Sequence, residues 1–366
     1  MDHAFRGPDF TLGIEEELMI VDQDGHGLVN AIERFLSKST EGEVKPELME
    51  SVLEISTDPC DDMTAVGRQL RQLRRRVREE AGPHGLTIGS AGTHPFARWE
   101  EQRIVARDRY RELVDALRFV ARQELIFGMH VHVGIDDPDK AIHVTNGMRV
   151  HLPVLLALSA NSPFWRGSAT GLMSARMPIF RAFPRVGIPR AYADWEHWST
   201  QTEFMVRSGV IADYTYLWYD VRPHPNLGTV EIRVCDQQTS VEHTLALAAL
   251  IQAMVRELVE HFDSGEQLSD YPYPMLDENK WLAARHGLDG ELVDLPSDER
   301  VSTRQLAKRL VDRLRAHAQD LGGERELEGI VDLLERGNGA ARQLKVFEAN
   351  NDMGEVMAEI VAASGA

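Results

Sequence analysis

The chain has 366 residues, of which 43% are hydrophobic and 27% are charged, enough to form one large or two medium globular domains. Its 40 basic and 58 acidic residues give a formal net charge of −18, which argues against a nucleic-acid-binding surface and against binding to anionic membranes. Two cysteines cannot build a disulfide framework, and the sequence has neither a secretory signal nor an apolar run of membrane-spanning length. We therefore expect a cytoplasmic protein.

The first predicted strand, residues 11–21, carries two carboxylates on one face. Period-2 alternation places Leu12 and Ile14 on one side and Glu15 and Glu17 on the other. Side chains two residues apart on a strand are separated by about 7 Å, so these two can bind one cation or a pair of cations. An edge strand with a wet face is the ordinary alternative for such a motif.

A second predicted strand, residues 52–56, adds Glu54. Either Glu47 or Glu50 is a candidate to join it; strand parity favours Glu50, and the choice stays open. A helix through about residues 61–80 follows, and we expect its many arginines to lie on a solvated face. A second amphipathic helix is predicted at residues 107–122.

The predicted strand at residues 126–135 alternates apolar residues with His130 and His132, which share their face with Gly128 and Gly134. Glycines at such positions let a ligand approach the backbone closely. Because histidine both binds transition metals and donates hydrogen bonds to phosphate, the pair is consistent with contact to a metal or to a phosphate.

A helical region is predicted at residues 137–159, with Pro153 either kinking it or beginning a second helix. The following segment, residues 161–193, is rich in proline, glycine and arginine and is too long for a plain connection. Loops of this length usually cover a site or an interface. A helix at residues 195–208 is expected after it.

Another predicted strand pair, residues 214–222 and 229–236, contributes charges of both signs. Asp220 and Arg222 share one face of the first strand. Glu231 and Arg233 share one face of the second, where a surface ion pair is the ordinary alternative.

The C-terminal part of the chain is predicted to be mainly helical. A strong apolar helix spans about residues 241–262, and the portion from about 274 to 366 is almost wholly helical. Within it, residues 305–321, 324–336 and 354–362 are expected to form a small bundle packed on the sheet.

If the predicted strands lie side by side, their shared face carries about five carboxylates, two imidazoles and two arginines. Such a face suits two or three Mg²⁺ or Mn²⁺ ions with phosphates between metal and arginine. The sequence has no P-loop or Rossmann motif, and the two cysteines lack the spacing of a structural zinc site.

Seven segments in order along the chain resemble the carboxylate–amine ligase family, the type 2 glutamate–cysteine ligases of the glutamine synthetase-like superfamily. These segments are residues 13–17 (GIEEE), 53–60 (LEISTDPC), 128–134 (GMHVHVG), 155–165 (LLALSANSPFW), 218–223 (WYDVRP), 229–236 (TVEIRVCD) and 279–281 (NKW).

The resemblance implies an α+β fold in which a curved, mainly antiparallel sheet forms a funnel-shaped active site with helices on its outer side. Residues 1–366 would form a single catalytic domain with a mainly helical portion from about 274 to 366. The implied cofactors are ATP and Mg²⁺ or Mn²⁺, and a homodimer or higher homo-oligomer is expected.

The resemblance also implies roles for individual residues. The implied metal ligands are Glu15, Glu17, Glu54, His130 and Glu231. Arg222 and Arg233 match arginines that hold the transferring phosphate or the substrate carboxylate and are the expected catalytic residues. The expected substrate- or ATP-binding residues are His132, Asp220, Asn226, Lys280 and Arg285.

The implied reaction is ATP-dependent amide formation through an acyl phosphate, with an amino-acid carboxylate and an amine as substrates, as in the joining of glutamate to cysteine. The segment at 161–193 is the expected amine-substrate pocket and lid. Three alternatives stay open: a phosphoryl transferase of the guanidino-kinase type, a catalytically inactive ligand-binding homologue, and a metal-dependent hydrolase that uses the histidine pair.

Overall fold

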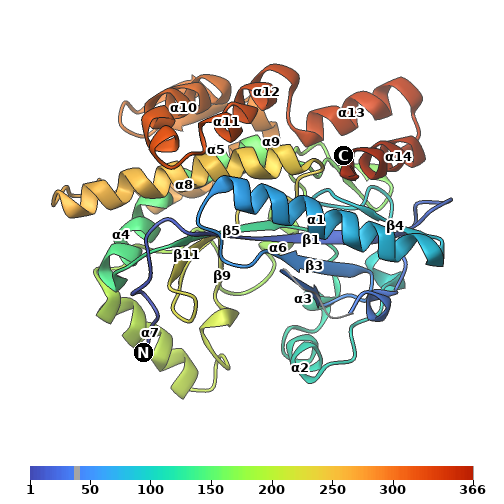
Figure 1. The fold of residues 1–366 in the computed structure, drawn as a ribbon, viewed down its shortest axis with the longest axis horizontal. Helices are drawn as coiled ribbons and strands as arrows, with labels where there is room; N and C mark the ends of the chain where they lie inside the picture. Colours follow the sequence, from blue (N-terminus) through green and yellow to red (C-terminus); the bar gives the residue numbers. More distant parts are fainter. Residues whose placement is uncertain (37–41, 366) are drawn as a thin grey trace.

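A seven-stranded sheet forms the centre of the structure, a computed structural model that describes residues 1–36 and 42–365 (Figure 1). Its strands run in the order β10, β11, β5, β1, β3, β2, and β4 also pairs with β1. They are β1 (Leu12–Asp22), β2 (Glu43–Pro46), β3 (Val52–Ser56), β4 (Leu86–Gly89), β5 (Met129–Gly134), β10 (Val221–His224) and β11 (Thr229–Ile232). Each pairing that the described residues make in this sheet is antiparallel.

Three short strand pairs lie outside the central sheet. They are β6 (Phe164–Trp165) with β7 (Ser168–Ala169), β8 (Val186–Gly187) with β9 (Trp218–Tyr219), and β12 (Glu291–Asp294) with β13 (Glu299–Ser302). The β8–β9 pair is parallel. The protein is therefore mixed α+β with mainly antiparallel sheet, as the sequence predicts.

Helices cover one face of the central sheet in two layers. The layer against the sheet holds α1 (Met63–Ala81), α4 (Pro138–Met148) and α8 (Val241–Asp263). The outer layer holds α5 (Leu152–Ser159), α9 (Tyr273–His286), α10 (Thr303–Asp320), α11 (Glu324–Leu327), α12 (Gly329–Arg336) and α13 (Gly339–Asn350) (Figure 1). The last helix, α14 (Met353–Ser364), packs against α13 and directly on β4. Seventeen of the residues of α8 are buried, so this helix links the sheet to the C-terminal helices.

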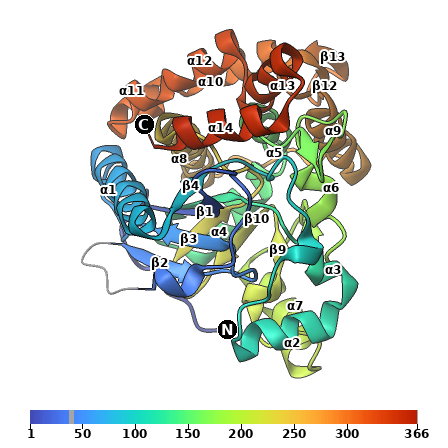
Figure 2. The same cartoon turned by 90° about the vertical axis from the view of Figure 1, so that its right-hand side faces the viewer.

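The other side of the sheet is less covered. Figure 2 shows α2 (Asp108–Leu117) and α7 (Trp195–Arg207) near the end of the molecule opposite the C-terminal helices. The short helices α3 (Phe119–Arg122) and α6 (Arg176–Phe180) complete this side. The arrangement leaves room over one face of the strands, where the carboxylates of β1 point.

Three predicted elements differ in detail from the structure, and the structure also decides between the two alternatives predicted at Pro153. The helix expected at 107–122 breaks into α2 and α3 at Arg118, whose φ of 51° is incompatible with a continuous helix. Pro153 begins a second helix rather than kinking the first, because proline is tolerated in the first turn. The β12–β13 hairpin interrupts the predicted helical C-terminal portion.

The strand expected at 214–222 is divided, because its backbone bonds to two partners in turn. Residues Tyr214–Tyr216 form a turn of 3₁₀ helix, and β9 and β10 follow it. Between these strands the Asp220 N–H donates to the Gly187 carbonyl, while the Asp220 carbonyl accepts from the N–H of Arg233. The chain thereby changes neighbours at Asp220.

A buried ion pair fastens α1 to the core face of β1. Glu16 and Arg74 are 0% and 3% exposed, and the guanidinium bonds both carboxylate oxygens at 2.7 Å. Thr244 of α8 donates to the same carboxylate at 2.6 Å. Arg74 thus corrects the expectation that the arginines of this helix all lie on a solvated face: its partner comes from a distant strand.

None of the helices within residues 1–36 and 42–365 combines the length and the apolar character that crossing a bilayer requires.

We predict that Arg74→Met destabilises the protein by about 3–5 kcal/mol, because it leaves the Glu16 carboxylate buried without its partner. Urea unfolding followed by circular dichroism measures this loss. The matched control is Arg71→Met on the same helix, whose half-exposed ion pair with Glu242 contributes under about 1 kcal/mol. Equal stabilities for the two variants would contradict the role given to the buried pair.

Candidate active site

Antiparallel register brings side chains from three strands onto the open face of the sheet. Glu15 of β1 lies opposite His130 of β5, and Glu17 lies opposite Glu54 of β3. Residues i and i+2 of a strand point the same way, so Glu15 and Glu17 share this face. The predicted strands therefore lie side by side, as the proposed shared face requires.

A cavity of about 370 Å³ lies over this face. The carboxylates that line it are Glu15, Glu17, Glu47, Glu54 and Glu124. The arginines that line it are Arg109, Arg176, Arg222 and Arg233. An aromatic wall is formed by Tyr110, Phe180, Phe183, Tyr216 and Trp218. The cavity thus combines many acids with several cations in one enclosed space.

One part of the site is electrically compensated. The carboxylate of Glu231, 0% exposed, accepts from Arg222 Nε at 2.6 Å and also from Arg233. Burial alone would raise the pKa of Glu231, but the two guanidinium groups outweigh it and hold that pKa well below its usual range. Glu231 is therefore ionised, and its two arginines are fixed in place.

The two imidazoles have different surroundings. His130 Nδ1 lies 3.0 Å from a Glu15 oxygen, and burial together with nearby Arg233 lowers the pKa of His130 to about 4. His132 Nδ1 lies 3.0 Å from Thr229 Oγ1, while its Nε2 is buried and makes no hydrogen bond within the described residues. Burial alone would lower the pKa of His132, but the carboxylates of Glu231 and Glu15 together outweigh it and raise that pKa.

That free Nε2 atom faces carboxylates. It lies 3.7 Å from a Glu15 oxygen, and one ligand atom from each of Glu15, His132 and Glu231 lies within 4.8 Å of the other two. Such a trio can hold a metal ion. The sequence predicts a metal role for His130 and a substrate role for His132. His130 Nδ1 also lies beside these carboxylates, 3.0 Å from Glu15 and 3.9 Å from Glu231, so both histidines border the group and their roles stay predictions.

The opposite part of the cavity is mainly acidic, although the Lys45 ammonium lies 3.8 Å from a Glu54 oxygen there. Burial, with the charge of Glu47 beside it, raises the pKa of Glu17 to about 7. Burial and Glu15 raise the pKa of Glu54 well above its usual range, and burial raises those of Glu47 and Glu124. Carboxyl groups that resist ionisation in this way would be stabilised as anions by a bound cation.

The choice between Glu47 and Glu50 is decided by the chain path. Glu47 lines the cavity, whereas Glu50 pairs with Arg103 at 2.7 Å outside it. Strand parity favoured Glu50, but parity does not extend to either residue because 47–51 is a turn between β2 and β3.

Two arginines have unpartnered donors in the cavity. The Nε atoms of Arg176 and Arg233 are buried and make no hydrogen bond within the described residues, and Arg176 also donates to the backbone carbonyls of Val234 and Arg233. Buried donors without partners are unfavourable unless a ligand satisfies them. Arg176 belongs to the long segment at 161–193, and only its place in that arginine-rich loop hinted at this role.

Four expected substrate-binding residues have other surroundings. Lys280 and Asp220 form a buried ion pair of 2.5 Å in a small recess beside Arg176. Asn226 is exposed in the β10–β11 turn and lies outside the cavity lining, and Arg285 is exposed and donates to the Gly171 carbonyl. Neither Asn226 nor Arg285 reaches the cavity, because each is placed by a turn or a helix that faces away from it.

The segment at 161–193 forms part of the cavity wall through Arg176, Phe180 and Phe183. It is tied to α9 by the Arg181–Asp277 ion pair, whose two contacts measure 2.5 and 2.8 Å. The expectation that this segment covers a site agrees with this position.

Comparison with known proteins identifies the same family that the sequence motifs resemble. The model of glutamate–cysteine ligase family 2 matches residues 11–362. The chain belongs to this family. A relative from Rubrobacter xylanophilus, provisionally named glutamate–cysteine ligase 2-1, is 43% identical over 355 residues, which cover 96% of this chain and 94% of the relative. One from Solibacter usitatus, provisionally named glutamate–cysteine ligase 2, is 39% identical and covers 96% and 92%.

Solved structures show the same fold. The glutamate–cysteine ligase of Francisella tularensis, solved in complex with AMP, superposes with a TM-score of 0.71 at 15% identity, covering 100% of this chain and 89% of that one. A bifunctional glutathione synthetase from Pasteurella multocida gives 0.71 at 16% identity, covering 98% and 52%. As a member of glutamate–cysteine ligase family 2, the protein is an ATP-dependent carboxylate–amine ligase.

We predict that Glu17→Gln stabilises the metal-free ligase, by about 2 kcal/mol at pH 8 and by little at pH 5. The raised pKa of Glu17 means that its contribution to stability is complete below about pH 4.5 and is lost as the pH rises through about 7. The variant has no such loss. Urea unfolding in EDTA at both pH values measures the difference.

The control is Glu50→Gln, which removes a carboxylate that lies outside the cavity, in the turn between β2 and β3. An equal gain from this variant, or a gain from Glu17→Gln that does not grow with pH, would contradict the crowding of acids in the cavity.

Proposed function

We propose that this ligase joins the γ-carboxyl group of glutamate to the amine of cysteine, forming γ-glutamylcysteine at the cost of ATP. The observation that carries the proposal is the division of one cavity into an acidic part and an arginine part. A triphosphate with bound cations complements this division, because its negative oxygens would face the arginines and its cations would face the carboxylates. Membership of the family supplies the substrate class.

The arginine part suits the phosphate that moves. An oxygen of the substrate carboxylate attacks the γ-phosphorus, the bond from phosphorus to the β,γ-bridging oxygen breaks, and ADP leaves. Arg222 and Arg233 are held in place by Glu231, and Arg176 and Arg233 have donors to spare. Donors fixed before the reaction neutralise charge on the phosphoryl oxygens without reorganising.

The amide forms in a second step. The neutral amine of cysteine forms a bond to the acyl carbon, the carbon–oxygen bond to phosphate breaks, and inorganic phosphate leaves while the nitrogen loses one proton to solvent. We infer that the segment at 161–193 forms the amine-substrate pocket and closes over it. Its contribution of Arg176, Phe180 and Phe183 to the cavity supports this inference.

The residues present fit divalent cations. Glu17, Glu47 and Glu54 would hold them on the acidic side, and Glu15, His132 and Glu231 supply a further group of ligand atoms. Mg²⁺ or Mn²⁺ bound there would neutralise phosphate oxygens during transfer. Carboxyl groups with raised pKa values lose part of the cost of ionisation when such an ion binds.

We further propose that the whole chain is one catalytic unit with a funnel-shaped site. One continuous cluster of buried apolar residues extends from Phe5 in the N-terminal segment to Leu333 in α12 and includes both sheet and C-terminal helices. A core that the sheet and the C-terminal portion share supports one domain rather than two domains with separate cores.

We predict that the purified protein releases phosphate from ATP only when glutamate, cysteine and Mg²⁺ are all present, and that EDTA abolishes the release. Coupled measurement of phosphate and ADP, with product identified by mass spectrometry, tests this. Steady ADP formation from ATP and one substrate without an amine would instead indicate a phosphoryl transferase, and activity without ATP a hydrolase.

Arg233→Lys should lower kcat/KM by about 10²-fold, because lysine cannot hold both Glu231 and a phosphate oxygen with a planar fork. The matched control is Arg103→Lys, an exposed arginine outside the cavity that should leave kcat/KM unchanged. Undiminished turnover by Arg233→Lys would contradict the role given to the arginine part.

A further inference from the structure

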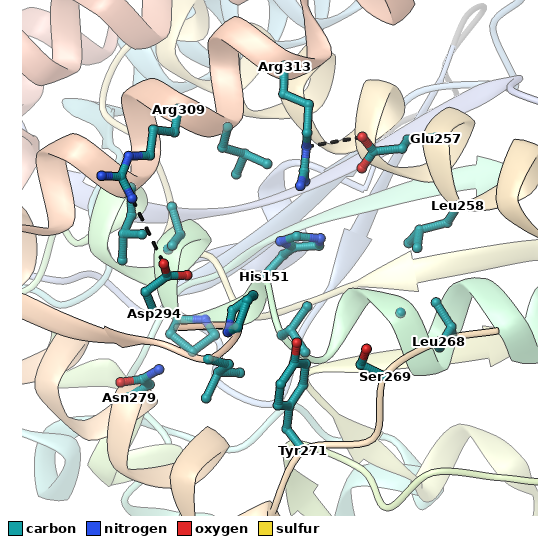
Figure 3. A pocket seen from close by; sticks show the side chains of 18 of the residues that line it. His151, Glu257, Leu258, Leu268, Ser269, Tyr271, Asn279, Asp294, Arg309 and Arg313 are labelled. Carbon is teal, nitrogen blue, oxygen red and sulfur yellow. Dashed lines mark ion pairs between the residues drawn. The ribbon is translucent and has the colours of Figure 1, made fainter. Parts of the chain in front are cut away.

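A second cavity, of about 480 Å³, lies away from the ligase site between α8, α9 and α10 (Figure 3). Pockets of about 300–1,000 Å³ are the usual size for small ligands. Helix α9 separates the two sites: Asn279 lines this cavity, while the next residue, Lys280, pairs with Asp220 beside the ligase cavity. The second cavity is therefore a separate space with its own lining.

One part of its wall is apolar. The aliphatic side chains come from four different parts of the chain and include Val150, Val154, Leu258, Leu292, Leu306 and Leu310. Burial of an aliphatic group against such walls is favourable by roughly 25 cal/mol for each Å² removed from water. The walls therefore select a ligand with an apolar body.

Charges of both signs are placed around the same cavity. Arg313 lies 3.0 Å from Glu257, and Arg309 lies 3.9 Å from Asp294. Figure 3 shows both ion pairs on one side of the cavity, with Tyr271 and Ser269 on the other. A third pair, His261 with Glu266 at 3.8 Å, completes the charged lining.

A histidine ring adds a neutral polar group to this lining. The ring of His151 is half-buried and lines the cavity between the arginines and Tyr271 (Figure 3). Burial, together with the charge of Arg313, lowers the pKa of His151 to about 3. The imidazole is therefore neutral and offers one donor and one acceptor to a ligand.

From this lining we propose that the cavity is a second binding site, for a free α-amino acid with an apolar side chain. Its carboxylate would meet Arg309 or Arg313 and its ammonium group would meet Glu257 or Asp294. Glu257 engages the Nε of Arg313, so the rest of the guanidinium can also donate to a ligand carboxylate and Glu257 can also accept from a ligand ammonium group. A ligand with only one charge makes only one of these two contacts. A zwitterion with an aliphatic body makes both and also packs against the apolar part of the wall.

The test is isothermal titration calorimetry of the full chain with L-leucine, L-leucinamide and 4-methylpentanoate. We expect saturable binding of one leucine per chain, and at least tenfold weaker binding of the two analogues, each of which lacks one charge. Leucine binding should fall at least tenfold in Arg313→Gln. It should be unchanged in the control Arg300→Gln, whose similarly exposed ion pair with Glu291 lies outside the cavity.

Leu310→Trp, which fills the cavity from its wall, provides a second variant that should abolish leucine binding while the circular dichroism spectrum is retained. Absence of saturable binding below about 10 mM leucine would overturn the proposal. So would equal affinity for the three compounds, or leucine binding that survives Arg313→Gln unchanged. Since none of these outcomes depends on ATP turnover, they are independent of the proposed ligase activity.

Discussion

The pairing of Glu231 with Arg222 and Arg233 is the interaction on which the ligase site depends. Antiparallel register places Glu231 opposite Arg222, and the carboxylate is fully buried between the two guanidinium groups. A buried carboxylate without those partners would be strongly unfavourable, and so would two buried arginines without it. Arg222 and Arg233 can therefore stay buried in the site because Glu231 neutralises them and holds them in place.

The same pairing explains why the acids of the cavity do not behave alike. Glu15, next to His130, and Glu231, next to the arginines, have pKa values well below the usual range although burial alone would raise them. Glu17 accepts a backbone N–H from Gly128, and Glu54 lies 3.8 Å from the more exposed ammonium of Lys45; neither contact offsets burial, which raises both pKa values. The cavity therefore contains carboxyl groups that are ionised and others that resist ionisation. Bound cations would stabilise the latter as anions, and a polyphosphate would in turn bind those cations.

Much of this could be predicted from sequence because strand alternation is a local property. It correctly placed Glu15 and Glu17 on one face of β1 and both histidines on one face of β5. It gave no access to partners chosen by tertiary structure: Glu16 of the same strand points to the opposite face, where Arg74 of a distant helix meets it. Glu47 reaches the cavity from a turn, and Arg176 from the start of the short helix α6 within the long segment at 161–193, where strand alternation does not apply.

The central claim is that nucleotide phosphates and divalent cations share the cavity over the open face of β1 and β5. Its most direct test is a crystal structure of the full chain with Mn²⁺ and a non-hydrolysable ATP analogue, with manganese located by anomalous scattering. The account predicts manganese beside Glu17, Glu47 or Glu54 and the γ-phosphate within hydrogen-bonding distance of Arg222 or Arg233. Ordered nucleotide and manganese bound elsewhere on the protein, with this cavity filled only by water, would contradict it.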